Sequence, residues 1–170
     1  MPDEDLAADL QEAVVGLLAE AGFERYEVSG YAKSGEICRH NVNYWTFGDY
    51  LAIGAGAHGK VTAEDGIFRA ARFANPERYM RAVEEGTDPY EDKRRVTEEE
   101  LPFEFMLNAL RLTAGVPKRL WTEHTGLNAD VIAGTVAALQ RDGLWTTQPN
   151  RIGTSPRGFA FLSSVQEAFL

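Results

Sequence analysis

Cysteine is almost absent from this chain, which has a single one, Cys38, in 170 residues. One thiol excludes a disulfide framework within the chain and indicates a reducing, cytoplasmic compartment. It also excludes an iron–sulfur cluster held by this chain alone, because such clusters generally take several thiolates. Cys38 on its own is predicted to be a small, buried apolar residue.

Positive charge and long hydrophobic runs are also scarce. The chain has 17 Lys and Arg against 26 Asp and Glu, and neither residues 1–95 nor residues 96–170 carry an excess of positive charge. We therefore expect no nucleic-acid partner. No stretch approaches the roughly 18 apolar residues that a membrane span needs. The acidic start, Met1-Pro2-Asp3-Glu4-Asp5, is unlike a secretory signal.

What is present is the composition of an ordinary globular protein, with 44% hydrophobic residues. The spacing of Leu6, Leu10 and Val14 predicts a helix that ends near Gly22. The alternation over residues 23–29 then predicts a strand. A helix followed by a strand in this way is typical of a parallel sheet.

Residues 30–49 are predicted to form an irregular loop, and a loop of that length in a compact domain is usually functional. A short apolar strand at 50–53 then leads into a run rich in glycine. A hairpin with the turn Glu64-Asp65-Gly66 follows, and Asn75-Pro76 opens a further helix.

Beyond a charged linker predicted at 89–95, the pattern becomes helical. We predict helices at about 98–113, 118–124 and 129–142, a hairpin between 144–147 and 151–153, and a final helix capped by Thr154 or Ser155. Three helices, a hairpin and a helix form a winged-helix-like arrangement. DNA binding is disfavoured, because the third helix has one basic residue, Arg141, and the wing has one, Arg151.

The run Gly54-Ala55-Gly56-Ala57-His58-Gly59 matches the glycine pattern of dinucleotide-binding proteins. Such a site needs a helix directly after the glycines, and the hairpin predicted here disfavours it. Two interpretations stay open: a tight turn at a sheet edge, or a close approach of the backbone to a flat ligand.

The run His40-Asn41-Val42-Asn43-Tyr44-Trp45 is the second candidate site. Histidine and tyrosine both bind porphyrin iron, and tryptophan can stack on a planar ring. Spacing alone favours the alternative, a structural loop anchored by the two aromatic residues.

Residues 26–32, 38–45 and 48–59 together resemble the HemW family of heme chaperones, radical S-adenosylmethionine proteins similar to oxygen-independent coproporphyrinogen III oxidases. The run from Pro102 to Asn108 resembles the start of that family's C-terminal domain. This resemblance implies an α/β (α+β) chain in two domains. Residues 1–88 would be the C-terminal part of an incomplete radical-SAM (β/α) barrel, and residues 96–170 a small winged-helix-like domain.

The resemblance also implies the ligands and where they bind. Heme would contact His40, Asn41, Tyr44 and Trp45, and S-adenosylmethionine would lie close to Gly54, Gly56 and His58. The family holds a 4Fe-4S cluster with a C-x-x-x-C-x-x-C motif that this sequence lacks. We therefore expect the cluster and S-adenosylmethionine to act in a longer protein, and we assign no catalytic residue, metal site or radical chemistry to this chain.

The expected partners are heme and acceptor hemoproteins. The alternative is a true oxygen-independent coproporphyrinogen III dehydrogenase of heme biosynthesis, which decarboxylates propionate side chains by radical abstraction. The His-Asn-x-x-Tyr-Trp run favours the chaperone, because within the family it separates the two groups.

Overall fold

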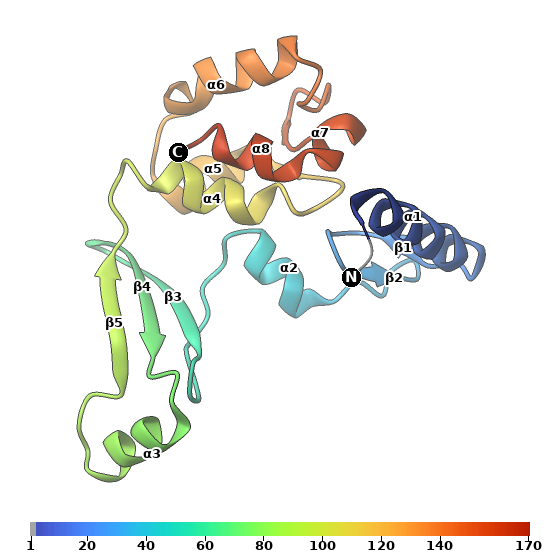
Figure 1. Cartoon of the computed structure of the whole chain (residues 1–170). Coiled ribbons are helices and arrows are strands. Elements are labelled where there is room, and N and C mark those ends of the chain that lie inside the picture. Colours follow the sequence, from blue (N-terminus) through green and yellow to red (C-terminus); the bar gives the residue numbers. More distant parts are fainter. Residues whose placement is uncertain (1–2) are drawn as a thin grey trace.

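The structure is a computed structural model that describes residues 3–170, so Met1 and Pro2 of the acidic start lie outside the described residues. It has three regions: a helix with a two-stranded sheet, a three-stranded antiparallel sheet, and a helical region that ends the chain (Figure 1). The helices of residues 3–170 are α1 (Glu4–Glu20), α2 (Arg39–Trp45), α3 (Pro76–Glu84), α4 (Leu101–Ala109), α5 (Arg119–Thr125), α6 (Asp130–Arg141), α7 (Pro156–Ala160) and α8 (Leu162–Glu167). The strands are β1 (Glu24–Arg25), β2 (Tyr31–Ala32), β3 (His58–Ala63), β4 (Gly66–Arg72), β5 (Tyr90–Arg95), β6 (Val116–Pro117) and β7 (Arg151–Ile152).

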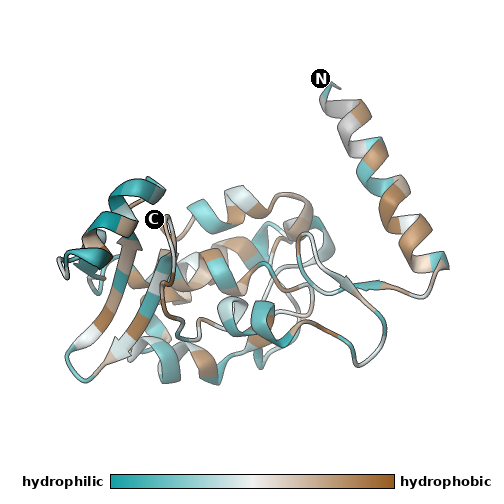
Figure 2. Ribbon diagram, turned by 90° about the horizontal axis from the view of Figure 1, so that it is seen from below, coloured by the Kyte–Doolittle hydropathy of each residue, from teal (hydrophilic) through white to brown (hydrophobic). Residues whose placement is uncertain are grey.

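Helix α1 confirms the first predicted helix. Its N-terminus is capped by Asp3, whose carboxylate accepts a 2.9 Å hydrogen bond from the Leu6 amide. The helix stands away from the rest of the molecule (Figure 2). Its apolar stripe is accordingly exposed, with Leu10 at 53% and Leu17 at 66% of their full accessibility.

Strand β1 pairs with β2 in antiparallel register, so the parallel sheet predicted from the helix–strand order is wrong for this chain. All the strand pairs of residues 3–170 are antiparallel. The chain reverses close to Gly30, whose carbonyl accepts hydrogen bonds from the Tyr26 and Glu27 amides. A reversal this tight brings the next strand back beside the first one.

The hairpin predicted around Glu64-Asp65-Gly66 is confirmed, because β3 pairs with β4 over the whole length of β3. Strand β5 adds to β4, so the prediction of a linker at 89–95 is wrong. β5 is an edge strand with mostly exposed side chains, and such strands tolerate the charges that suggested a linker. The strand predicted at 50–53 is also wrong, since its residues pair through one bridge, between Tyr50 and Lys60.

The remaining predicted helices before the wing are confirmed as α3, α4, α5 and α6. Asn75 caps α3, with Pro76 in the first turn, as the sequence predicts. Helices α4, α5 and α6 contribute to the main core, whose fully buried side chains include Phe105, Trp121 and Val165. Burial of large apolar side chains such as these is the main driving force for folding.

The end of the helical region differs from the prediction in two details. Strand β7 pairs with β6, whereas residues 144–147 meet the opposite arm through a single bridge between Trp145 and Thr154. The final helix is divided into α7 and α8 at Phe161, and Ser155 provides its N-terminal cap. The order of helices and wing remains winged-helix-like. No helix within residues 3–170 is long and apolar enough to cross a membrane.

Candidate functional site

Helix α2 carries the His-Asn-x-x-Tyr-Trp run, so the irregular loop predicted for residues 30–49 is wrong there. Residues 39–45 hold no glycine or proline, and the glycines that suggested a loop lie outside the helix. Helix geometry places residues four positions apart on one side. His40 and Tyr44 therefore lie together, with 3.0 Å between His40 Nε2 and Tyr44 Oη and 4.6 Å between their ring centroids.

The side of α2 that holds His40 and Tyr44 is open. His40 is exposed and Tyr44 is half-buried. The Tyr50 ring meets Tyr44 edge to face, with 4.4 Å between centroids, and the Tyr50 hydroxyl accepts a 2.7 Å hydrogen bond from Arg69 Nη1. We call His40, Tyr44 and Tyr50 the outer face of α2. It presents an imidazole and a phenol beside a second, fixed aromatic ring.

The other two predicted heme-binding residues, Asn41 and Trp45, lie on a different side of α2. Asn41 Nδ2 donates a 3.0 Å hydrogen bond to Tyr26 Oη. Trp45 packs against the main core and against Arg111, whose guanidinium carbon lies 4.2 Å from a Trp45 ring centroid. We call Asn41 and Trp45 the inner face of α2. The structure therefore divides the four predicted residues between two faces.

The chain leaves α2 through Phe47, whose φ of 63° lies in the left-handed region. Phe47 is buried and meets the Phe105 ring of α4 edge to face, with 5.5 Å between centroids. Gly48 follows because a Cβ there would lie 2.2 Å from Asn43 Oδ1. Packing of Phe47 into the core thus sustains an unfavourable backbone conformation and fixes the end of α2.

Lys60 of β3 is buried beside this exit. Its ammonium group donates to Phe47 O at 2.9 Å, to Asp49 Oδ1 at 2.8 Å and to Thr62 Oγ1 at 3.1 Å. Burial lowers the pKa of Lys60 below its ordinary value, against the opposing effect of Asp49. Burial would raise the pKa of Asp49, but hydrogen bonds from Lys60 and Thr62 outweigh it and hold that pKa below its ordinary value. Because each ammonium proton has a partner, the role of Lys60 is structural: it holds the segment that follows α2 in place.

Gly54 and Gly56 form a turn, and His58 begins β3. The φ values of 98° at Gly54 and 70° at Gly56 favour glycine, because a side chain in that conformation is strained. The Gly54 amide donates to Tyr79 Oη at 3.3 Å, and the Gly56 amide to Phe73 O at 2.8 Å. A strand follows these glycines, so the helix of a dinucleotide site is missing, as predicted. The geometry supports the tight turn, and a ligand contact at these residues stays a prediction.

Comparison with known proteins shows what the helical region and the whole chain are similar to. Residues 96–161 match the model of the HemN C-terminal domain. After the model that they match, we refer to residues 96–161 as the HemN C-terminal domain. The whole chain is 39% identical to the heme chaperone HemW of Haemophilus influenzae and to that of Escherichia coli, and it covers 43% and 44% of their lengths. The resemblance to the HemW family is thereby confirmed, over a chain that spans less than half of these relatives.

The fold is similar to the solved structure of coproporphyrinogen III oxidase (HemN) from Escherichia coli, which is a radical SAM enzyme. The TM-score is 0.70, and the match covers 99% of this chain and 42% of that one. The sequences are 15% identical, so the similarity concerns the fold alone. It confirms the predicted combination of helices and strands.

Cys38 directly precedes α2 and is exposed, so the buried position predicted for it is wrong. Each residue of the segment 33–40, in which it lies, is exposed, and the segment contributes nothing to the core. One thiolate does not fit a 4Fe-4S cluster, which generally takes several. Across residues 3–170, no group of three or more His, Cys, Asp or Glu side chains is placed to hold a metal ion.

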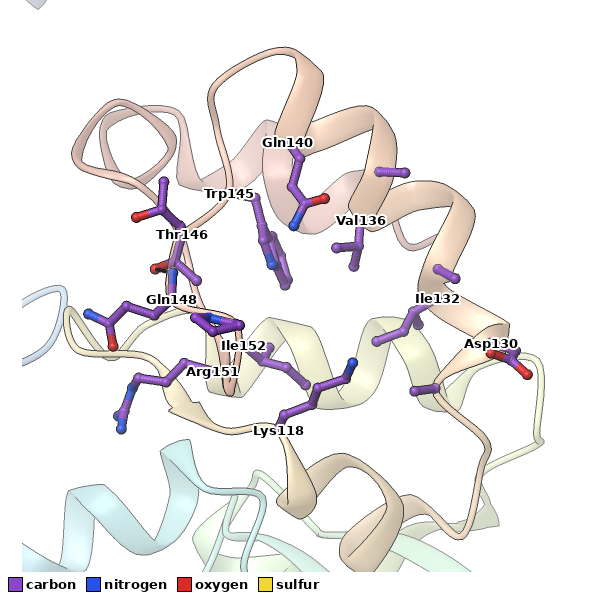
Figure 3. Close-up of a pocket in the computed structure, with 15 residues that line it drawn as sticks. Lys118, Asp130, Ile132, Val136, Gln140, Trp145, Thr146, Gln148, Arg151 and Ile152 are labelled. Atoms are coloured by element: carbon purple, nitrogen blue, oxygen red, sulfur yellow. Dashed lines mark hydrogen bonds between the residues drawn. The ribbon is translucent and has the colours of Figure 1, made fainter.

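A separate cavity of about 380 Å³ lies within the HemN C-terminal domain. Ile132 and Val136 line it from α6, and Trp145 and Ile152 from the wing (Figure 3). Lys118 lies at its edge. Its lining includes no residue of α2 and no residue of the glycine turn, so it is distinct from both sites that the sequence predicts.

Sequence reasoning missed the residues that hold the inner face, namely Tyr26, Glu27 and Arg111. Tyr26 and Glu27 lie in a run that carries the family resemblance, yet no local pattern connects them with α2. Arg111 follows α4, far along the chain, in the HemN C-terminal domain. Periodicity reports on neighbours along one element, so it gives no signal for contacts between distant elements.

Proposed function

We propose that this chain supplies the heme-binding face of a HemW-type heme chaperone, and that heme meets the outer face of α2. The pairing of His40 with Tyr44 on an open helix face carries this proposal. Imidazole and phenolate are both axial ligands of heme iron. Tyr50 adds an aromatic surface on which a flat porphyrin can pack. The relatives named heme chaperone support this cargo.

His40 and Tyr44 share one hydrogen bond, so their donor atoms lie on the same side of any bound porphyrin. Iron accepts one axial ligand on each side, and either His40 Nε2 or Tyr44 Oη takes that place. The other group then loses its partner and turns to solvent or to the porphyrin edge. An exposed face of this kind suits a cargo that has to leave again for an acceptor hemoprotein.

Inner-face residues have a different role in this proposal. Asn41 and Trp45 hold α2 against the protein, and they affect heme through the position of the helix. We propose that the 4Fe-4S cluster is held by parts of the longer protein outside these 170 residues, since one cysteine does not fit a cluster. An S-adenosylmethionine contact near Gly54, Gly56 and His58 stays part of this proposal.

Titration with hemin, followed at the Soret band, tests the assignment. His40→Ala and Tyr44→Ala are each expected to weaken heme binding about ten-fold, a loss of about 1.4 kcal/mol. The matched control is His124→Ala, which removes a half-buried histidine of α5 and should leave affinity unchanged. Wild-type affinity in both outer-face variants would show that heme does not bind there.

A further inference from the structure

Trp45 lacks the hydrogen bond that usually fixes a buried indole. Its Nε1 is buried without a partner among residues 3–170. A buried indole N–H normally finds an acceptor, and that bond orients the ring. The position of Trp45 therefore depends on what packs against it, and the Arg111 guanidinium lies 4.2 Å from its ring centroid. A cation at this distance from an aromatic ring is attracted to its face.

Arg111 is itself held by an ion pair. Its Nη2 donates a 3.1 Å hydrogen bond to Glu27 Oε2, and Glu27 is 2% exposed. The other carboxylate oxygen, Oε1, accepts from the Ser29 amide at 3.0 Å and from the Ser29 hydroxyl at 3.1 Å. A buried carboxylate with both oxygens occupied has little freedom to move. The guanidinium against Trp45 is thus fixed at its far end.

The same short segment also holds the other inner-face residue. Tyr26, next to Glu27, accepts the hydrogen bond from Asn41. The backbone carbonyl of Tyr26 accepts a 3.1 Å hydrogen bond from the Thr113 amide. The backbones of Glu27 and Leu112 pair through an isolated antiparallel β-bridge. Residues 26–27 are therefore joined to the residues that follow α4. Of this joined group, Tyr26 contacts Asn41 and Arg111 contacts Trp45, so it holds both residues of the inner face.

We infer that Arg111 is a positioning residue. Through its contact with Trp45 it sets the orientation of α2, and with it the position of His40 and Tyr44 on the outer face. The inference rests on the proposed function, because the consequence of misplacing α2 is measured as heme binding. It gives the HemN C-terminal domain a definite part in the site: this domain supplies no residue of the outer face, but it holds the helix that does.

Two substitutions separate the charge of Arg111 from its shape. Arg111→Met removes the cation and the pair with Glu27, and it should weaken hemin binding about ten-fold. Arg111→Lys keeps the charge but loses the planar contact with the indole, and it should weaken binding about three-fold. The control is Arg119→Met, which removes an exposed arginine that pairs with Glu123 on α5 and should change nothing.

Spectroscopy and a double variant exclude a merely structural effect. At saturating hemin, Arg111→Met should change the Soret position, because a displaced α2 presents a different iron ligand. Combined with His40→Ala, it should cost less than about two-fold further, since coupled residues are not additive. Trp45→Phe keeps an aromatic ring but loses part of the face that Arg111 contacts, so it should weaken hemin binding about three-fold, as Arg111→Lys does. Should Arg111→Met fail to fold, Arg111→Lys and Trp45→Phe still test the inference.

The outcomes distinguish the inference from the function on which it rests. If His40→Ala weakens binding while both Arg111 variants bind and absorb like wild type, the positioning role is wrong and the heme site stands. A full additive loss in the double variant would also overturn the role. If His40→Ala and Tyr44→Ala bind heme like wild type, the proposed function itself fails.

Discussion

On the outer face of α2, His40 and Tyr44 contact each other and solvent, whereas on the inner face Asn41 and Trp45 contact Tyr26 and Arg111. The four side chains belong to one run of six residues, and helix geometry alone divides them. Their shared presence in a motif therefore does not mean that they share a ligand. Two of them are free to meet a cargo, and two are engaged in holding the helix.

The difference has a practical consequence for the interpretation of mutations. A substitution on the outer face should change heme affinity and leave stability nearly unchanged. A substitution on the inner face should lower stability first, and change affinity only because α2 moves. Measurements of affinity alone would make both faces look like ligand contacts, so each variant needs a free energy of unfolding as well.

The largest stability effect is expected from Trp45→Ala. The variant removes a large, partly buried side chain that packs on the main core and on Arg111, which should lower the free energy of unfolding by about 2–3 kcal/mol. Urea denaturation followed by circular dichroism measures this loss. His40→Ala is the control on the outer face and should stay within about 0.5 kcal/mol. Equal losses in the two variants would remove the distinction between the faces.

Two substitutions of Tyr44 distinguish the contribution of its aromatic ring to heme binding from that of its hydroxyl group. Tyr44→Phe keeps the contact with Tyr50 and loses the hydrogen bond to His40, so hemin affinity should fall only about two-fold. Tyr44→Ala loses both, and the expected fall is about ten-fold, or about 1.4 kcal/mol. Hemin titration measures both variants. If the phenylalanine variant loses as much as the alanine variant, the hydroxyl matters and the aromatic surface does not.

A smaller effect is expected at the other end of the inner face. Asn41→Ala and Tyr26→Phe each remove one partner of a single hydrogen bond, and each should lower the free energy of unfolding by about 1 kcal/mol. The double variant should cost less than the sum, because the same bond is lost in all three. Strict additivity in urea denaturation would show that Asn41 and Tyr26 do not hold α2 together.

The smallest effect is expected on stability at low pH, and it arises from Asp49 in the segment that follows α2. The pKa of Asp49 is lower in the folded chain than its ordinary value of 3.8, so the folded state binds fewer protons there. Its contribution to stability is present above that ordinary value and is lost as pH falls through the lowered pKa. The stability difference between wild type and Asp49→Asn should therefore be constant near neutral pH and shrink below about pH 4. Urea midpoints over this pH range would contradict the role of Asp49 if the difference stayed constant.

The helical region could be predicted well from the sequence, because its elements follow from local patterns. Apolar spacing and caps predict α4, α5 and α6, and the turn residues Glu64-Asp65-Gly66 predict the β3–β4 hairpin. Strand β5 was predicted as a linker, since its charges read as solvent-exposed while its pairing with β4 depends on a distant partner. Local propensity is a weak guide wherever such a partner decides the structure.

The candidate site could be predicted only in part. His40 and Tyr44 are ligand-forming residues at a spacing of four, and once α2 is known to be a helix this spacing brings them together. The sequence does not predict this helix, because glycines on both sides of it are a strong signal for a loop. The support from Glu27 and Arg111 has no local signature, since the fold alone makes them neighbours of Trp45.

Nuclear magnetic resonance of the chain with ferric heme is the direct test of heme binding at the outer face of α2. Paramagnetic iron broadens nearby resonances steeply with decreasing distance. If heme binds there, signals of His40, Tyr44 and Tyr50 should broaden first, while those of Ile132 and Val136 in the α6 cavity should stay sharp. Broadening centred on that cavity, with the outer-face signals unchanged, would contradict heme binding at the outer face.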